Sequence, residues 1–172
     1  MTVVTSGPKG TRWHFQYMRM IRSYNLFANY YHSNCEMVNL DCPYCDILNF
    51  FQEFFNLKDW LINDEVLQKG VVEKFYYSTV ELKLCGDIAN GTKHLELTQR
   101  NPKIGQHSRM YNVINIEFTL NDDSCLDEQK HTIRPIIALE DGREFDAFNV
   151  ATECKEKLAQ FLKENNVRLE GE

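Results

Sequence analysis

The sequence predicts an α+β fold in which an antiparallel bundle of about four helices precedes a three-stranded antiparallel β meander and a C-terminal helix. Apolar residues recur every three or four positions along most of the chain, but every second position between Tyr111 and Leu120. A chain of 172 residues with 43% hydrophobic content is long enough for one domain with a sizeable core. We therefore expect a single domain over residues 1–172, with a flexible lead-in (1–10), the bundle (11–98), the meander (109–146) and the last helix (147–166).

The first predicted helix begins near Trp13 and carries apolar and aromatic residues at the spacing of one helix face. These are Tyr17, Ile21, Tyr24, Ala28 and Tyr31. Such a stripe is typical of a surface that packs into a core. Residues 1–34 hold basic but no acidic side chains, yet the net charge of −6 argues against a nucleic-acid partner, which would favour a dense basic surface.

The second predicted helix, Tyr44 to Asn63, is apolar around most of its circumference, so we expect it at the centre of the bundle. Asn63 and Asp64 then offer an N-cap for a third helix from Glu65 to about Ser78.

The stretch from Val80 to Leu97 is the predicted fourth helix, around which we expect the other elements to pack. Its apolar face comprises Val80, Leu84, Ile88, Gly91 and Leu95. Because glycine disfavours helices, a glycine on this face indicates a neighbouring helix that passes close to Gly91. The alternative is that the helix ends at Asn90 and Gly91, a common helix-end sequence.

Two strands are predicted after a polar loop, one from Tyr111 to Leu120 and one from His131 to Leu139, with an acidic loop over residues 121–130 between them. Pro135 argues for an edge position or a bulge, because proline cannot donate a ladder hydrogen bond.

A two-residue turn at Asp141 and Gly142 leads into a short third strand, Arg143 to Phe145. The last helix then begins between Asp146 and Asn149. It is expected to bury Val150, Cys154, Leu158, Phe161 and Leu162.

A polar seam beside the apolar face of the fourth helix is the first candidate site. It comprises Asp87, Asn90, Lys93 and His94. A carboxylate that orients an imidazole could serve ligand binding or acid/base chemistry. The other interpretation is a structural hydrogen-bond network, favoured because no nucleophile or metal-ligand spacing accompanies the four residues.

A second candidate is the set His32, Cys35, Cys42 and Cys45, which has the residue types of a zinc site. Only Cys42 and Cys45 have a compact spacing, and their CPYC tetrapeptide also resembles the active site of glutaredoxins. A predicted helix precedes the motif where that fold requires a strand. We therefore expect ordinary reduced thiols, no metal and no cofactor.

Two stretches resemble a group of uncharacterised bacterial proteins: FFQEFFNLKDWLIND at residues 50–64 and LCGDIANGTKHLEL at residues 84–97. Such proteins are often encoded by accessory genes on mobile elements, which implies an optional cellular role. No activity follows from this resemblance.

The chain also resembles the HEPN ribonucleases, small helical proteins that dimerise and place an arginine and a histidine in a shared cleft. In that family the arginine and the histidine are separated by four to six residues, and Arg100 and His107 fit the long end of this spacing. The resemblance implies RNA cleavage without a metal, with His107 near a reacting oxygen and Arg100 near the phosphate. Pro102 and Gly105 interrupt the interval, which departs from a regular helical placement.

The functional expectation is a cytoplasmic accessory protein that binds a small ligand or another protein, with the metal-independent ribonuclease as the alternative. No phosphate-binding loop, HExxH motif or nucleophile elbow occurs in the sequence. No apolar run is long enough for a membrane span, and the N-terminus lacks the apolar core of a signal peptide. The many aromatic residues could leave an apolar patch for a second subunit, so a homodimer is one expected assembly.

Overall fold

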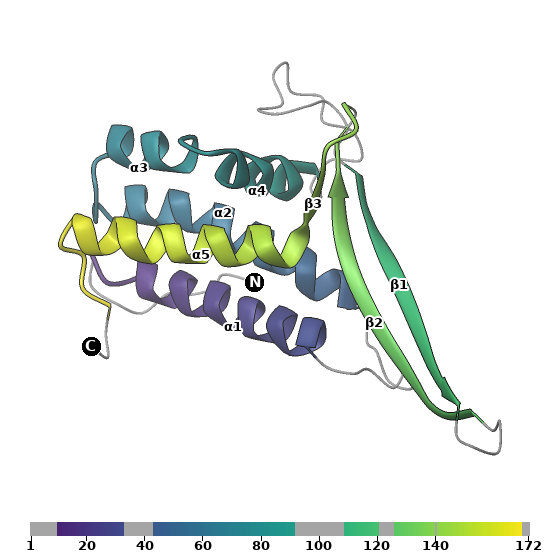
Figure 1. Ribbon diagram of the computed structural model, residues 1–172. Helices are drawn as coiled ribbons and strands as arrows, with labels where there is room; N and C mark the ends of the chain where they lie inside the picture. Colours follow the sequence, from purple (N-terminus) through teal and green to yellow (C-terminus); the bar gives the residue numbers. More distant parts are fainter. Residues whose placement is uncertain (1–9, 33–42, 92–108, 121–125, 140, 170–172) are drawn as a thin grey trace, which may run out of the picture.

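Five helices and an antiparallel sheet make up the computed structural model, which describes residues 10–32, 43–91, 109–120, 126–139 and 141–169, with only the backbone for strand residues up to 133 (Figure 1). The α+β class is confirmed. The elements are α1 (Trp13–His32), α2 (Pro43–Asn63), α3 (Lys69–Tyr76), α4 (Val80–Gly91), β1 (Arg109–Leu120), β2 (Leu126–Ala138), β3 (Glu144–Asp146) and α5 (Ala147–Glu164).

The helical bundle includes α5, although this helix comes from the far end of the chain. α1 and α2 lie antiparallel, while α3 and α4 follow one another along one side of the bundle (Figure 1). α5 contacts α4, α1 and α2, and it crosses the front of the bundle in this view. The expected bundle of the first four helices is therefore corrected, because α3 and α4 share one side and α5 completes the packing.

α2 is the central helix, as its sequence predicts, and it contacts each of the other four described helices. Phe50, Phe51, Phe54, Leu57 and Leu61 of α2 are completely buried. The aromatic contacts extend from α2 to α1 and α3, with Tyr24 and Tyr76 packed edge-on or tilted against Phe50 and Phe54. Within the described residues, no helix is long and apolar enough to cross a membrane.

The start of α1 is held by Asp64, which follows the end of α2. Its carboxylate accepts hydrogen bonds from Trp13 N at 3.1 Å and from Arg12 Nε at 2.9 Å. The prediction that Asp64 caps the third helix is wrong. Glu65 adopts a φ of 57°, so the chain turns directly after Asp64, and α3 begins only at Lys69, after Gln68.

The apolar face predicted for α4 is only partly correct. Leu84 and Ile88 are buried, but Val80 is 37% exposed, and Gly91 has open space where a Cβ would lie. The close contact occurs instead at Gly86, where an added Cβ would come within 2.8 Å of the Phe55 ring. The middle of α4 is therefore buried around its whole circumference rather than along one face, since every residue from Leu84 to Ala89 is buried, and Leu95 lies outside the described residues.

The sheet is mainly a long hairpin at the end of the bundle where α5 begins (Figure 1). β1 and β2 pair antiparallel from Arg109 opposite Ala138 to Leu120 opposite Leu126, with a shift in register beside Leu120. β2 begins at Leu126 rather than the predicted His131, because pairing with β1 keeps the charged residues after 125 extended.

The third strand contributes little, since β3 is three residues long and pairs only with positions 136–138 of β2. The meander expected over residues 109–146 is thus a hairpin with a short addition at one end. Pro135 lies just beyond the β3 pairing, so β2 has a strand neighbour on one side only at this position. Gly142 has a φ of 86°, as a tight turn before β3 allows.

α5 begins after Asp146, whose carboxylate accepts hydrogen bonds from the backbone N–H groups of Phe148 and Asn149. The Tyr31 hydroxyl donates a hydrogen bond to the other oxygen of Asp146 at 2.8 Å, which joins the end of α1 to the start of α5. The apolar face predicted for α5 is confirmed. Val150, Cys154, Leu158, Phe161 and Leu162 are all buried.

Candidate functional site

The structure describes two members of the predicted polar seam. Asp87 is 5% exposed within a buried run of α4, and it is engaged with a neighbouring group. Asn90 is half-buried. Lys93 and His94 lie outside the described residues, so the seam as a ligand-binding or acid/base cluster stays a prediction.

The other predicted sites also lie largely outside the described residues. Arg100 and His107 do so completely, as do Cys35 and Cys42. His32 ends α1 and Cys45 lies in the first turn of α2, but only their backbone is described. Among the side chains that the structure describes, no three His, Cys, Asp or Glu residues come together as metal ligands.

Two other cysteines, Cys85 of α4 and Cys154 of α5, are free thiols in the core. Burial, together with the adjacent Cys154, raises the pKa of the Cys85 thiol well above its ordinary value. The Cys85 thiol donates to the Phe51 carbonyl oxygen at 3.6 Å. A buried thiol of raised pKa is a poor nucleophile, so Cys85 is a packing residue.

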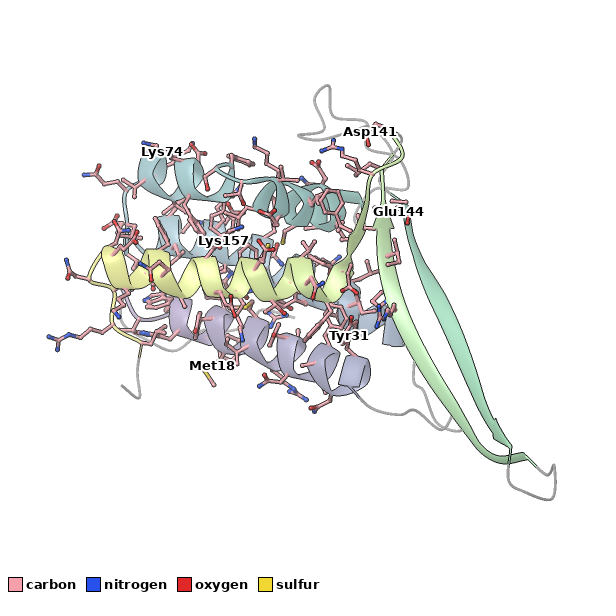
Figure 2. The ribbon with its side chains drawn as sticks, in the orientation of Figure 1. Met18, Tyr31, Lys74, Asp141, Glu144 and Lys157 are labelled. Carbon is pink, nitrogen blue, oxygen red and sulfur yellow. The ribbon has the colours of Figure 1, made fainter. Side chains whose placement is uncertain are left out.

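The outward side of α1 carries a row of large apolar side chains that the sequence analysis did not single out. Phe15, Met18 and Leu26 are 55%, 62% and 43% exposed. With Arg22 these residues follow one another at spacings of three, four and four, which is one helix face, and the exposed Asn29 ends the row three positions later. We call the surface formed by Phe15, Met18, Arg22 and Leu26 the α1 outer stripe. Met18 projects from α1 away from the other helices (Figure 2).

The inward side of α1 explains why the outer stripe faces solvent. Trp13, Met20 and Phe27 are buried at 2%, 0% and 0% exposure, and they lie about half a turn from the outer stripe. Of the predicted stripe on α1, Tyr24 is buried in the core, whereas Tyr17, Ile21, Ala28 and Tyr31 are partly buried and pack against it. A helix that is apolar on two opposite sides could bury either side, as far as its own sequence pattern is concerned. The exposed outer stripe could therefore be recognised only from the structure.

The polar contacts of α1 lie between the two faces and attach the helix to α2. Gln16 is buried and donates a hydrogen bond from Nε2 to the Glu53 carbonyl oxygen at 3.0 Å. Arg19 pairs with the Glu53 carboxylate. Arg22 lies in the middle of the outer stripe, exposed to solvent. The stripe therefore combines apolar side chains with one central positive charge.

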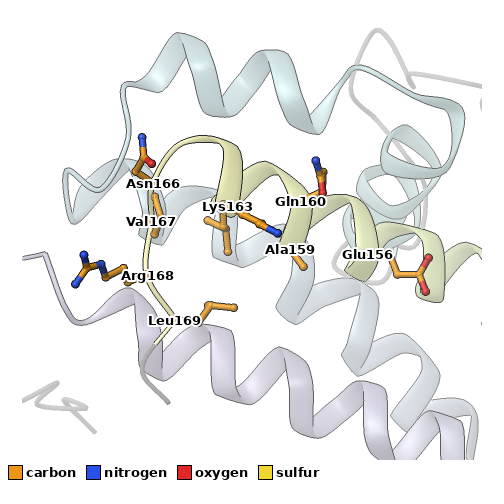
Figure 3. A pocket seen from close by; sticks show the side chains of 9 residues that line it. Glu156, Ala159, Gln160, Lys163, Asn166, Val167, Arg168 and Leu169 are labelled. Atoms are coloured by element: carbon orange, nitrogen blue, oxygen red, sulfur yellow. The ribbon is translucent and has the colours of Figure 1, made fainter. Parts of the chain in front are cut away.

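Two open depressions lie along α5. The larger, about 730 Å³, is bordered by the last turns of α5 and the segment that follows, including Gln160, Lys163 and Arg168 (Figure 3). The other, about 460 Å³, lies between α5 and the junction of α3 and α4, beside the stacked rings of Phe75 and Phe161. Both are lined by a mixture of polar or charged and apolar side chains, the apolar ones including Phe75, Leu82 and Phe161 in the smaller depression.

An ion-pair cluster borders the smaller depression. Lys157 Nζ lies 2.7 Å from Glu81 and 2.8 Å from Glu153. Partial burial acts to raise the pKa of Glu81, but several smaller contributions, led by the hydrogen bond from Lys157 and including its positive charge, together lower the pKa below its ordinary value. The contact between Lys157 and Glu81 links α5 to the first turn of α4, which is a structural role.

Comparison with known proteins adds no assignment, because no family model, curated protein or solved structure matches this chain. The α1 outer stripe is therefore the candidate site with the best support from the geometry itself.

Proposed function

We propose that this protein is a protein-binding module, and that the α1 outer stripe docks an acidic amphipathic helix of a partner. The observation that carries the proposal is the exposure of Phe15, Met18 and Leu26 on one face of a helix whose opposite face is already in the core. Large apolar side chains that gather on one exposed face are typical of interaction surfaces, whereas single exposed ones are common.

The geometry of the stripe suits a helical partner. Anchors at spacings of three and four along α1 match the ridges and grooves of a second helix laid along it. α1 contains no acidic residue, and the exposed Arg22 occupies the position between Met18 and Leu26 along the outer stripe. A partner helix with an acidic residue near its centre would complement this charge and exclude basic competitors.

A small-molecule ligand is less favoured by the described residues. Small-ligand sites are usually enclosed and largely apolar, with a few convergent polar groups. The two depressions beside α5 are open, and the space between the helices is filled by buried aromatic and aliphatic side chains.

The test is site-specific photocrosslinking in cells that express the full chain, with a photoreactive phenylalanine at position 15 or 18. Val71 of α3 is the control position, because it is also a large exposed apolar residue, at 39%, but lies outside the stripe. We expect the same crosslinked protein from positions 15 and 18 and none from position 71, with the crosslink mapped to an acidic helical segment. Arg22→Glu should reduce the yield severalfold.

A structural role of the stripe makes a different prediction. If Met18→Ser lowers the midpoint of thermal unfolding substantially and no specific crosslink forms, the stripe belongs to the fold and the proposal fails. Since Met18 is mostly exposed, we expect the unfolding free energy to change by less than about 0.5 kcal/mol.

The ribonuclease hypothesis stays a prediction, because Arg100 and His107 lie outside the described residues. It requires metal-independent cleavage of RNA by the purified protein that both Arg100→Ala and His107→Ala abolish. Cleavage that survives both substitutions would come from another source.

A further inference from the structure

We propose that β1 is the interface of a homodimer, in which the β1 strands of two copies pair antiparallel about a twofold axis at Val113. The strand order β1-β2-β3 places β1 at the edge of the sheet. β1 is 12 residues long, and in the described part of the chain its only strand neighbour is β2. The backbone groups along its other edge are thus a template for a further strand.

The composition of β1 lacks the features that normally prevent such pairing. Its sequence, RMYNVINIEFTL, contains no proline and no glycine, and its only charged residues are Arg109 and Glu117. The strand is otherwise rich in β-branched and aromatic residues, which favour extended pairing. The register shift beside Leu120 affects only its last position.

β2 provides an internal comparison, because β3 covers only positions 136–138 and leaves one side of β2 without a strand neighbour from 126 to 135 in the described part. This stretch, LDEQKHTIRP, carries Asp127, Glu128, Lys130, Arg134 and Pro135. Charges and proline are the usual means of protecting an edge. Of these two edges, which have no strand neighbour within the described residues, the edge of β2 carries protecting residues and that of β1 does not.

The charges of β1 select a second copy of the same strand and its register. Arg109 and Glu117 are separated by an even number of positions, so they belong to the same face of the strand. An antiparallel pair centred on Val113 sets Arg109 of each copy opposite Glu117 of the other. A register centred on Arg109 or Glu117 would instead set like charges opposite each other, which is destabilising.

The existing hairpin extends this pattern. Glu117 is paired with Lys130 across β1 and β2. In the proposed dimer, Glu117 is therefore flanked by Lys130 of its own copy and Arg109 of the other. The two symmetric sets alternate positive, negative and positive charge across the joined sheets.

The first test is the assembly of the full chain, measured by sedimentation velocity and native mass spectrometry at micromolar concentration. We expect a dimer whose dissociation constant rises on the order of tenfold or more in Glu117→Arg, because two like-charged pairs replace two attractive ones. Arg109→Glu should weaken it similarly, and the double exchange should restore it. Glu128→Arg, a charge reversal in the same hairpin on β2, should leave it unchanged.

The second test probes the register. In Val113→Cys the two introduced thiols lie opposite each other, so mild oxidation should link the subunits. In Asn115→Cys each thiol lies opposite Tyr111, and the yield should fall to that of the unmodified protein. A monomer at about 100 μM, above the micromolar to picomolar dissociation constants of standard-size interfaces, would overturn the proposal, including the case in which a different protein supplies the added strand. A dimer insensitive to both charge reversals, or equal crosslinking at positions 113 and 115, would also overturn it.

Discussion

The carboxylate of Asp64 accepts a hydrogen bond from the backbone N–H of Trp13, 51 positions earlier in the chain. The first N–H groups of a helix have no partner within the helix, and α1 has no acidic residue in its first turn. Asp64 supplies both the missing acceptor and a negative charge at the positive end of the helix. The end of α2 thereby holds the start of α1.

We expect Asp64→Asn to lower the free energy of unfolding by about 1–2 kcal/mol at pH 7, because a hydrogen-bonded charge buried at 3% exposure is lost. Asp59→Asn is the matched control on α2, since the Asp59 side chain is 67% exposed and its ion pair with Lys58 is 3.8 Å long. Urea denaturation of the two variants measures the difference. Equal effects would mean that Asp64 contributes no more than a surface carboxylate.

The same pair predicts a dependence on pH. Burial acts to raise the pKa of Asp64, but hydrogen bonds from the backbone of Gly10 and Trp13 and from Arg12 lower it below the ordinary 3.8. A lowered pKa stabilises the folded state above the unfolded pKa, and this contribution is lost as the pH falls through the folded pKa. The gap between wild type and Asp64→Asn should be constant above about pH 5 and narrow below about pH 4. A gap unchanged at about pH 3, below the ordinary carboxyl pKa, would exclude the charge as its origin.

Gly86 tests the close packing of α4 against α2. A Cβ at this position would lie 2.8 Å from Cε2 of Phe55, so Gly86→Ala should lower the free energy of unfolding by about 1–3 kcal/mol despite the better helix propensity of alanine. Gly70→Ala in α3 meets no atom within 4 Å and should be neutral or stabilising. In a Phe55→Leu background the cost of Gly86→Ala should largely disappear. If it persists, the ring contact is not its cause.

The cap of α5 predicts a coupling between Asp146 and Tyr31. Asp146→Ala removes two backbone hydrogen bonds and the bond from the Tyr31 hydroxyl, so we expect a loss of about 1–2 kcal/mol. Tyr31→Phe should cost about 1 kcal/mol alone but almost nothing in the Asp146→Ala background. The Tyr24 hydroxyl lies 3.0 Å from that of Thr152, so Tyr24→Phe is the control and should lower the free energy of unfolding equally in both backgrounds. Additive effects of Tyr31 and Asp146 would show that the contact is energetically irrelevant.

Sequence periodicity predicted the α+β class, the central position of α2 and the buried face of α5. These features depend on amphipathic patterns within one element, as in the Val150 to Leu162 face of α5. The pattern of α1 was ambiguous because it has apolar residues on two sides, and only packing against α2 and α5 places Trp13 inside and Met18 outside. The candidate site on α1 could therefore not be assigned from the sequence.

The sequence by itself determined which stretches form the helices and the long hairpin, because periodicity and turn chemistry act over a few neighbouring residues, but it did not determine where α3 and β2 begin. Only the tertiary structure decided that Asp64 caps α1, that Gly86 rather than Gly91 lies at the close crossing, and that α5 completes the bundle. Each of these contacts joins residues that are distant in the chain. Which of these contacts form depends on which surfaces meet when the whole core is buried, and no local sequence pattern contains that information.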